Sequence, residues 1–444
     1  MQDLSRHFAE TLTVSQPDSL DDATVTEAHR ALVNFMGVAL GGADHEAMDI
    51  TLKALGQFTG PGTAAVLGRR ETVDMSMAGL LNGISSHIHD FDDTTPSNYI
   101  HPTSPVASAL FAWAAVHPIS GRDFLHAFAL GFDVVTRIGD ATYPNHYQAG
   151  WHSTGSIGIF GAAVAIGRLL RLDAQQMLWA IGMAGTQASG LRDNFGSMAK
   201  GFHPGHAARC GIEAAFLAQA GFNTGNTPLE GPRGFAAVTA GGLLDVDNLM
   251  DSFGSHYRFE GITYKPYPCG IVIHPTIELC SSIHAEGTAP EQVEKVELQV
   301  APIVRDLCDQ RPTRGLQGKF SIYHAAAIGL VRGQGRLSEF TDEAIADPAL
   351  AAMRDRVTPV AVDGQSADSV RAIVTLKDGT VIDRFLPESL GNVKRPLSND
   401  QLNDKFLNQI TALGGDQAQQ VLDACWKLEE MENVGDLVRA TVPR

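Results

Sequence analysis

The sequence lacks the features that define several protein classes. Its five cysteines are widely spaced and include no Cys-x-x-Cys pair, so we expect neither a disulfide framework nor a cysteine-based zinc site. No uninterrupted apolar run reaches the ~18 residues of a membrane span, and the N-terminus has no basic segment followed by an apolar one. We therefore expect a cytoplasmic protein without a membrane partner.

Motifs for nucleotide binding and for a serine nucleophile are also missing. The glycine-rich stretches match neither G-x-G-x-x-G nor G-x-x-x-x-G-K-[ST], and no G-x-S-x-G occurs. The formal charge of −17 argues against nucleic acid as a partner, because phosphate backbones require a basic surface. An anionic substrate would need a local cluster of Lys, Arg or His. The sequence therefore favours cofactor-free chemistry at such a cluster.

The composition predicts a globular protein with more than one domain. The chain has 444 residues, of which 44% are hydrophobic and 19% charged. From about residue 24 to residue 240, apolar and small residues recur at helical spacing, as in 103–116 and 157–170, which predicts a bundle of packed helices.

Strand patterns occur only after Pro268. Residues 293–300 alternate apolar and polar side chains, and residues 370–385 contain two strand-like runs around Lys377-Asp378-Gly379, which predicts a hairpin. Residues 320–330, 341–356 and 399–427 are predicted to be helical. The simplest arrangement is a mainly α protein, in which residues 1–265 and 395–444 form a large helical domain and residues 266–394 form a smaller α+β domain.

The densest polar cluster runs from His87 to Thr94 (HIHDFDDT) and is followed by His101. On a helix, the side chains at 87, 90 and 94 would share one face. Three interpretations stay open: a metal site of a hydrolase, an acidic motif like that of some terpene cyclases, or a solvated helix end. The metal site would use His87, His89, Asp90 and Asp93. A terpene pocket needs many aromatic walls, whereas only 7% of this chain is aromatic.

Three later clusters carry further cations. His152 precedes small and hydroxyl residues at the expected start of an apolar helix, where backbone N–H groups can meet a carboxylate. Lys200 stands before another small-residue helix, and His203 and His206 are interpreted as helix-start residues without a catalytic role. Two prolines fix the loop around Lys265. The cations are therefore His101, His152, Lys200 and Lys265, and the acid–base candidates are Asp90, Tyr147 and His152.

Five ordered segments make the chain similar to the MmgE/PrpD family, which includes 2-methylcitrate dehydratase, cis-aconitate decarboxylase and iminodisuccinate epimerase. The segments span 82–94 with His101-Pro102, 150–163, 184–209, 264–275 and 318–325. The resemblance implies a large all-helical domain built from both chain ends, a smaller α+β lid domain with a cleft between them, and a homodimer.

The resemblance also implies the site residues. Those expected to be catalytic are Asp90, His101, Tyr147, His152, Lys200 and Lys265, and those expected to bind substrate are Thr94, His87, Trp151, Ser153 and Lys319. No metal and no cofactor is expected. Tyr147 is included because its surroundings, YQAGWH, are similar to those of the epimerase. Where the decarboxylase has a histidine, this chain has Gly270, which argues against cis-aconitate decarboxylation.

The chemistry implied by the resemblance is proton transfer at carbon next to a carboxylate. Lys200, Lys265 and protonated His152 would stabilise the enolate-like intermediate. The leading hypothesis is a dehydratase-type lyase acting on a small di- or tricarboxylate, such as a 2-methylcitrate- or aconitate-like acid. The alternatives are an epimerase or racemase of a substituted succinate, a decarboxylase of the cis-aconitate type, the metal-dependent hydrolase above, and a binding protein that has lost turnover.

Overall fold

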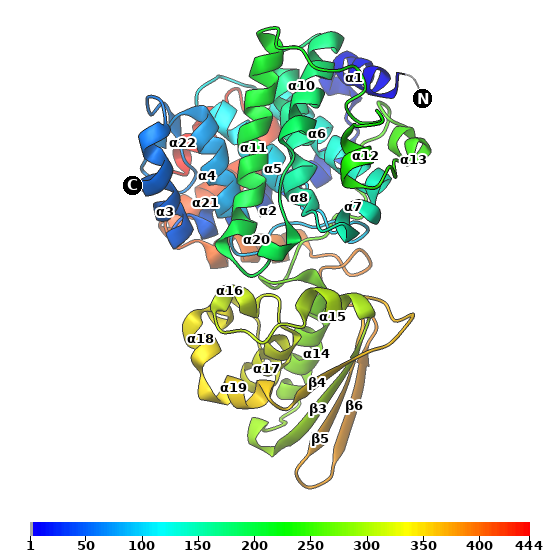
Figure 1. The fold of residues 1–444 in the computed structure, drawn as a ribbon. Coiled ribbons are helices and arrows are strands. Elements are labelled where there is room, and N and C mark those ends of the chain that lie inside the picture. Colours follow the sequence, from blue (N-terminus) through cyan, green and yellow to red (C-terminus); the bar gives the residue numbers. More distant parts are fainter. Residues whose placement is uncertain (1–2) are drawn as a thin grey trace.

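The computed structural model describes residues 3–444; residues 1 and 2, which open the predicted large domain, lie outside the described part. Two hydrophobic cores form two bodies, one above the other in Figure 1. Residues 4–264 and 397–438 supply the buried side chains of the larger core, and residues 269–374 supply those of the smaller one. The predicted fold class, a mainly α protein with a smaller α+β part, is confirmed. We call the smaller body the lid.

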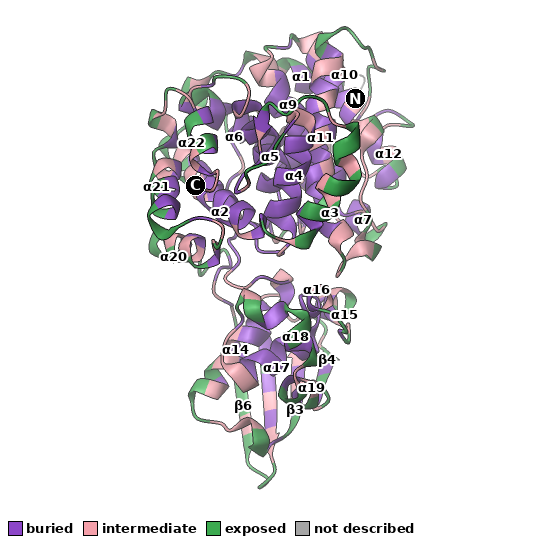
Figure 2. Cartoon of the chain, turned by 90° about the vertical axis from the view of Figure 1, so that its left-hand side faces the viewer, coloured by how far each residue is buried: buried purple, intermediate pink, exposed green. Residues whose placement is uncertain are grey.

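The large body contains most of the helices. They are α1 (Leu4–Val14), α2 (Asp22–Gly42), α3 (Glu46–Leu55), α4 (Met75–His87), α5 (Thr103–Ala114), α6 (Gly121–Thr142), α7 (Asn145–Gln148), α8 (Ser153–Ser156), α9 (Gly158–Leu169), α10 (Ala174–Gln187), α11 (Met198–Gln219), α12 (Phe235–Thr239), α13 (Val246–Met250), α20 (Asn399–Gln409), α21 (Gly415–Trp426) and α22 (Gly435–Ala440). Helices α4 and α5 are buried on nearly all sides (Figure 2), because small and apolar residues surround their axes.

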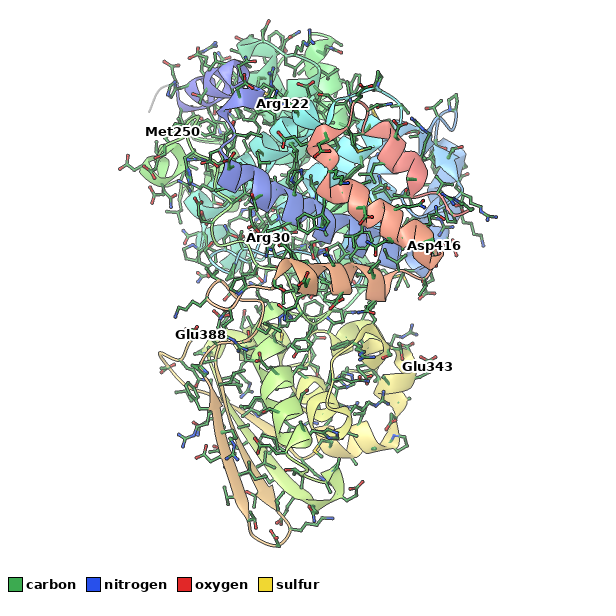
Figure 3. The ribbon with its side chains drawn as sticks, turned by 180° about the vertical axis from the view of Figure 1, so that it is seen from behind. Arg30, Arg122, Met250, Glu343, Glu388 and Asp416 are labelled. Atoms are coloured by element: carbon green, nitrogen blue, oxygen red, sulfur yellow. The ribbon has the colours of Figure 1, made fainter. Side chains whose placement is uncertain are left out.

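The C-terminal helices return to the first part of the chain. Leu402 and Phe406 of α20 enter the larger core. Arg30 of α2 donates a hydrogen bond from Nη2 to the carbonyl of Leu397 at 2.7 Å, where the chain leaves the lid. Seen from behind, α20 runs along the edge of the large body that faces the lid (Figure 3). Both chain ends therefore build one core.

The lid combines a sheet with helices. Its strands are β3 (Val293–Val300), β4 (Val357–Ala361), β5 (Val370–Leu376) and β6 (Val381–Leu386), in the order β4-β3-β5-β6, and its helices are α14 (His274–Ala285), α15 (Pro302–Cys308), α16 (Gly315–Gly318), α17 (Ile322–Arg332), α18 (Asp342–Ala346) and α19 (Pro348–Arg354). Strand β3 pairs parallel with β4 and antiparallel with β5, and β5 pairs antiparallel with β6. The predicted strand and hairpin are confirmed. Helices α14 and α17 pack against the sheet (Figure 1).

Four details differ from the prediction. Residues 399–427, predicted to be helical throughout, form the two helices α20 and α21 with a break at 410–414. Residues 341–356 form two helices because Asp347 accepts hydrogen bonds from two backbone N–H groups and Pro348 opens a new helix. Strand β4 was not predicted. The large body is not wholly helical, since β1 (Ala64–Ala65) pairs with β2 (Thr72–Val73). Among the described residues, no helix combines the length and apolarity of a membrane span.

Helices α4 and α11 cross closely at a pair of glycines. A Cβ atom on Gly83 would lie 2.3 Å from Gly205 Cα, a distance that no real contact allows. We expect Gly83→Ala to lower the free energy of unfolding by about 1–3 kcal/mol, because a methyl group must force the helices apart. Urea denaturation followed by circular dichroism measures this. Gly56→Ala is the control, since its Cβ would have no neighbour within 4 Å; equal effects of the two changes would contradict the close-packing argument.

Candidate active site

A cavity lies where the large body meets the lid. Its walls carry mostly polar groups on the side of the large body and mostly apolar groups on the side of the lid. The lining residues are Asp90, Thr94, Tyr99, His101, Tyr147, His152, Phe195, Lys200 and Lys265 from the large body, and Gly270, Ile271, Val272, Leu307, Cys308 and Phe320 from the lid.

Asp90 presents its carboxylate to the cavity from a turn. Helix α4 ends at His87, and Asp90 has a left-handed backbone with φ of 52°, which aspartate tolerates better than most residues. The expectation that residues 87, 90 and 94 share a helical face is therefore wrong, because the helix has ended before Asp90. Backbone conformations of this kind are held in place by their surroundings and concentrate at functional sites.

Two lysines from distant segments bind the carboxylate of Asp90. Lys200 Nζ donates to Asp90 Oδ1 at 2.6 Å, and Lys265 Nζ lies 3.0 Å from the same oxygen. Burial alone would raise the pKa of Asp90, but the two ammonium groups outweigh burial and hold this pKa well below its usual range. Asp90 is therefore ionised, and its Oδ2 has no hydrogen-bond partner within residues 3–444.

The local fold brings each lysine to this point. The sequence had suggested that Lys200 precedes a helix, but Lys200 is the third residue of α11. Lys265 lies two residues after Thr263. The Thr263 backbone exchanges two hydrogen bonds of 2.9 Å with the backbone of Thr94 and so holds this segment beside the turn that carries Asp90. Lys265 Nζ also donates to the Asp90 carbonyl at 3.1 Å. Burial lowers the pKa of Lys200, and Asp90 opposes this effect.

His87 connects Lys200 to Asp92. Because an ammonium group only donates, His87 Nε2 accepts from Lys200 Nζ at 2.9 Å, and the ring proton resides on Nδ1, which donates to Asp92 Oδ2 at 2.7 Å. Burial lowers the pKa of His87, so the ring is neutral. His87 lies behind Lys200 and does not line the cavity.

His101 presents its second nitrogen to a ligand. Nδ1 lies 2.7 Å from the Asp93 carbonyl and 3.4 Å from Asp92 Oδ1, so Nδ1 carries the proton and Nε2 carries a lone pair. Burial lowers the pKa of His101 well below its usual value, although Asp92 opposes the shift. A neutral imidazole oriented through Nδ1 by oxygen acceptors is the arrangement that a general base requires.

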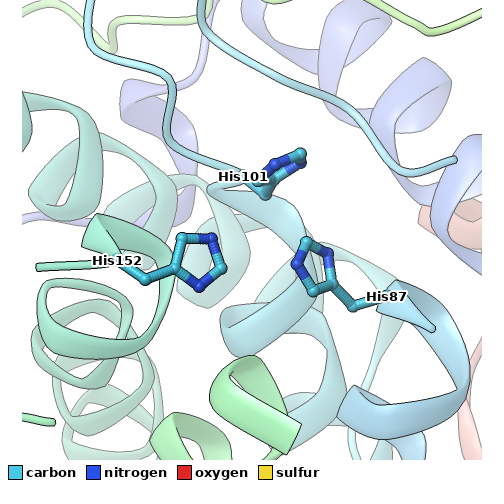
Figure 4. Close-up of side chains that lie close together, drawn as sticks. All are labelled: His87, His101 and His152. Carbon is cyan, nitrogen blue, oxygen red and sulfur yellow. The ribbon is translucent and has the colours of Figure 1, made fainter. Parts of the chain in front are cut away.

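His152 lies immediately before the four-residue helix α8, whereas the long apolar helix that was predicted to start here, α9, begins only at Gly158. Its Nδ1 is 2.8 Å from His203 Nδ1, and its buried Nε2 has no partner in the described chain. Burial lowers the pKa of His152 well below its usual value, and Lys200 and His203 add to the shift. The ring is therefore neutral in the ligand-free site, whereas the sequence argument had it protonated. The rings of His152, His87 and His101 lie close together (Figure 4), and the centroid of the His87 ring is 4.6 Å from that of His101 and 5.5 Å from that of His152.

Tyr147 lines the cavity from α7 and is held by Arg192, a residue that sequence reasoning missed. The Arg192 guanidinium lies 4.0 Å from the centre of the Tyr147 ring and donates to the Tyr147 carbonyl at 3.0 Å. It also binds Asp306 of the lid at 2.9 Å. Burial raises the pKa of the Tyr147 hydroxyl. A protonated phenol can give a proton but is a poor base.

The wall contributed by the lid was also missed. Phe320 and Phe195 place their rings 5.4 Å and 5.2 Å from Lys200 Nζ, so one aromatic ring from each body covers this ammonium group. Ile271, Val272 and Leu307 complete an apolar surface. The only signal in the sequence was the position of Phe320 beside Lys319 in a segment shared with the family.

Three other predicted substrate-binding residues lie outside the lining of the cavity. Lys319 donates to the carbonyls of His89 at 2.9 Å and Pro268 at 2.8 Å, so it ties the lid to the turn that carries Asp90. Trp151 faces a second hollow, near α12. Ser153 is buried in the first turn of α8. Thr94, by contrast, lines the cavity.

The residues proposed for a hydrolase metal site do not converge. His89 bonds the Gly41 carbonyl, and Asp93 accepts a hydrogen bond from Thr103 at 2.6 Å. A different set, His87, Asp90, Asp92 and His101, has ligand atoms within 4.8 Å of one another. Lys200 and Lys265 already compensate the charge of Asp90 there, and a metal ion would have to displace both ammonium groups.

Asp93 gives the site a pH-dependent contribution to stability. Burial raises the pKa of Asp93 from 3.8 to about 7, and Asp92 adds to this shift. The contribution of Asp93 to the unfolding free energy is complete below pH 3.8, its pKa in the unfolded chain. This contribution is lost as the pH rises through about 7, the pKa in the folded protein, and the change is about 4 kcal/mol. We expect Asp93→Asn, which keeps an acceptor for Thr103, to flatten the fall in unfolding free energy between pH 4 and 7.

Urea denaturation at several pH values measures this slope. The exposed Asp416→Asn is the matched control and should leave the slope unchanged. An unchanged slope in Asp93→Asn would contradict the assignment.

Known proteins match the chain over nearly its whole length. The MmgE/PrpD N-terminal domain matches residues 6–245, and the MmgE/PrpD C-terminal domain matches residues 267–428. Cis-aconitate decarboxylase from Aspergillus terreus is 25% identical over 97% of this chain and 94% of its own. The enzymes of that name from Mus musculus and Homo sapiens are 23% and 24% identical, over 99% and 98% of this chain and 93% of their own. These matches support an enzyme of lyase type.

Proposed function

The chain belongs to the MmgE/PrpD family, and on that premise we propose that it is a dehydratase-type lyase acting on a small di- or tricarboxylate. The observation that carries the proposal is the arrangement of Lys200, Lys265 and Asp90 beside two neutral imidazoles, His101 and His152, in one cavity. An anionic substrate is the ligand that such a cluster of cations and N–H groups suits. The surrounding protein, with its charge of −17, provides no general attraction for it.

The proposed reaction begins with removal of a proton next to a carboxylate. His101 Nε2 takes this proton, because its Nδ1 is already committed to oxygen acceptors. Lys200 and Lys265 stabilise the negative charge that develops on the carboxylate as the C–H bond breaks. The bond between the neighbouring carbon and its hydroxyl then breaks, and the departing oxygen takes the phenolic proton of Tyr147 and leaves as water.

A second candidate is an epimerase of a substituted succinate, which the position of Tyr147 favours. Epimerisation requires an acid that returns a proton to the face opposite the base. Tyr147 is protonated and lines the cavity together with His101. In this reaction no group leaves, so the same enolate-like intermediate is only reprotonated.

Decarboxylation is the reaction in the names of the related enzymes, and Gly270 argues against it here. The lid wall around Gly270 is apolar, with Ile271, Val272 and Leu307. Among the described residues, the only titratable group that lines the cavity from the lid is the Cys308 thiol, and burial raises the pKa of Cys308 well above its usual value. A carbanion left by departing CO2 would therefore have to be protonated from the large body.

Product analysis distinguishes these reactions. Purified enzyme is incubated separately with 2-methylcitrate, citrate, malate, cis-aconitate and iminodisuccinate, and each mixture is followed by proton NMR and circular dichroism. Loss of water from a hydroxy acid is the expected result. Inversion without loss would assign the epimerase, and CO2 release from cis-aconitate would assign the decarboxylase. No change in any mixture would contradict the proposed substrate class.

A further inference from the structure

His203 lies directly behind His152 on the side away from the cavity. The two Nδ1 atoms are 2.8 Å apart, and the ring centroids are 5.0 Å apart. His203 stands three residues after Lys200 in α11, so one helix carries Lys200 and also supports His152. His203 itself is buried but does not line the cavity. Within residues 3–444, the His203 ring forms a hydrogen bond with His152 alone.

This contact restricts the protons of both rings. Two nitrogens at 2.8 Å cannot both carry a hydrogen, because the hydrogens would collide, and two bare lone pairs would repel. Burial lowers the pKa of His203 to about 3, so neither ring carries an extra proton at neutral pH. One Nδ1 therefore donates and the other accepts. The choice decides what His152 Nε2 offers: a lone pair if His152 donates, or an N–H group if His203 donates.

The surroundings of His152 Nε2 favour the N–H form. This nitrogen is buried, has no partner within residues 3–444, and belongs to a ring that lines the cavity. An unpaired N–H group facing a site for anions gains an acceptor when a carboxylate binds, whereas a bare lone pair would repel it. We propose that His203 is a positioning residue that donates its Nδ1–H to His152 and thereby makes His152 Nε2 a hydrogen-bond donor to the substrate.

The backbone around His203 is built closely against its ring. A Cβ atom on Gly155 would lie 3.0 Å from His203 Cβ, and one on Gly190 would lie 3.4 Å from its Cγ. Gly190 also has φ of +121°, a conformation that other residues rarely adopt. The same glycine accepts a hydrogen bond from the backbone N–H of His152 at 3.0 Å. The His152 and His203 rings are therefore fixed relative to each other.

Two substitutions of His203, by asparagine and by aspartate, test the direction of the hydrogen bond between His203 and His152, because these two side chains are nearly equal in size. Asparagine at position 203 can still donate to His152 Nδ1, whereas aspartate only accepts and would draw the His152 proton onto Nδ1. We expect His203→Asp to lower kcat about 100-fold, because a wrong histidine tautomer removes the group that acts in the reaction. His203→Asn should stay within about ten-fold of the wild type by the same reasoning. The pH dependence of kcat should shift only in His203→Asp, because the new carboxylate raises the pKa of His152.

Nitrogen NMR of the free enzyme tests the proposal without turnover. The full chain is labelled with ¹⁵N-histidine, and the His152 signals are assigned by their loss in His152→Asn. The expected result is a neutral His152 with its proton on Nε2 in the wild type and on Nδ1 in His203→Asp. A wild-type proton on Nδ1, or equal losses of kcat in the Asn and Asp variants, would overturn the proposal. The kinetic measurement rests on the proposed function, but the NMR measurement does not. Failure of the positioning role of His203 can therefore be distinguished from failure of the proposed function.

Discussion

Lys200→Met is expected to lower kcat/KM by about 10³ or more, because removing one group that stabilises developing anionic charge costs on the order of 10²–10³ and Lys200 also holds Asp90. In the variant, the Asp90 carboxylate keeps only Lys265 at 3.0 Å, and His87 Nε2 loses its donor. Methionine is an unbranched side chain only one atom shorter than lysine, so we expect it to pack against Phe195 and Phe320 as the lysine stem does. The loss should therefore arise from the missing charge.

Steady-state kinetics with the substrate found by product analysis measures this effect. Lys295→Met is the matched control, since the Lys295 side chain on β3 is 58% exposed and lies in the lid sheet. The control should keep wild-type activity. Retention of activity within ten-fold in Lys200→Met would contradict the role assigned to the ammonium group.

His101→Asn is expected to lower kcat by about 10³, within the range of 10²–10⁴ that a general base contributes. The asparagine amide can still donate to the Asp93 carbonyl, as His101 Nδ1 does at 2.7 Å, but nothing replaces Nε2. The variant should therefore fold and bind substrate with a nearly unchanged KM. The expected loss lies in the proton-transfer step, so a kinetic isotope effect at the abstracted hydrogen should rise.

His256→Asn is the control for this change, because His256 pairs with Glu260 and its side chain is 43% exposed. Circular dichroism and urea denaturation verify that His101→Asn is folded. Wild-type kcat in a folded His101→Asn would assign the base to another residue, and the same measurement in Tyr147→Phe and His152→Asn would then locate it.

Periodicity predicted the secondary structure best where one face of an element is buried. From Val296 to Val300, strand β3 alternates buried and partly exposed side chains, and its residues 293–300 were predicted with the observed bounds. The fold class was predicted correctly for the same reason. The break at Asp347-Pro348 was missed although both residues signal a helix start. Strand β4 was missed because it is short and contains a proline.

The sequence indicated which polar residues gather at the cavity, but it did not indicate their contacts. Asp90, His101, Tyr147, His152, Lys200 and Lys265 all line it. Their individual roles stay predictions. The bond between His152 and His203 spans 51 residues, and no local pattern predicts such a contact. The neutral state of His152 follows from burial between Lys200 and His203, which depends on tertiary packing. The domain limits and the homodimer also stay predictions.

Deuterium incorporation from D2O tests the central claim most directly, namely that Lys200, Lys265 and the imidazoles move a proton next to a carboxylate. Chelator-treated wild type and Lys200→Met are incubated in D2O with the acids named above, and proton NMR follows the carbon next to each carboxylate. Forward dehydration leaves no new C–D bond, so the account predicts deuterium at that carbon in substrate recovered before complete turnover, or in the hydroxy acid formed when cis-aconitate takes up D2O, for the wild type, and none above background for Lys200→Met. Conversion of cis-aconitate to a hydroxy acid by the wild type with no deuterium at that carbon, or equal exchange in both proteins, would contradict it.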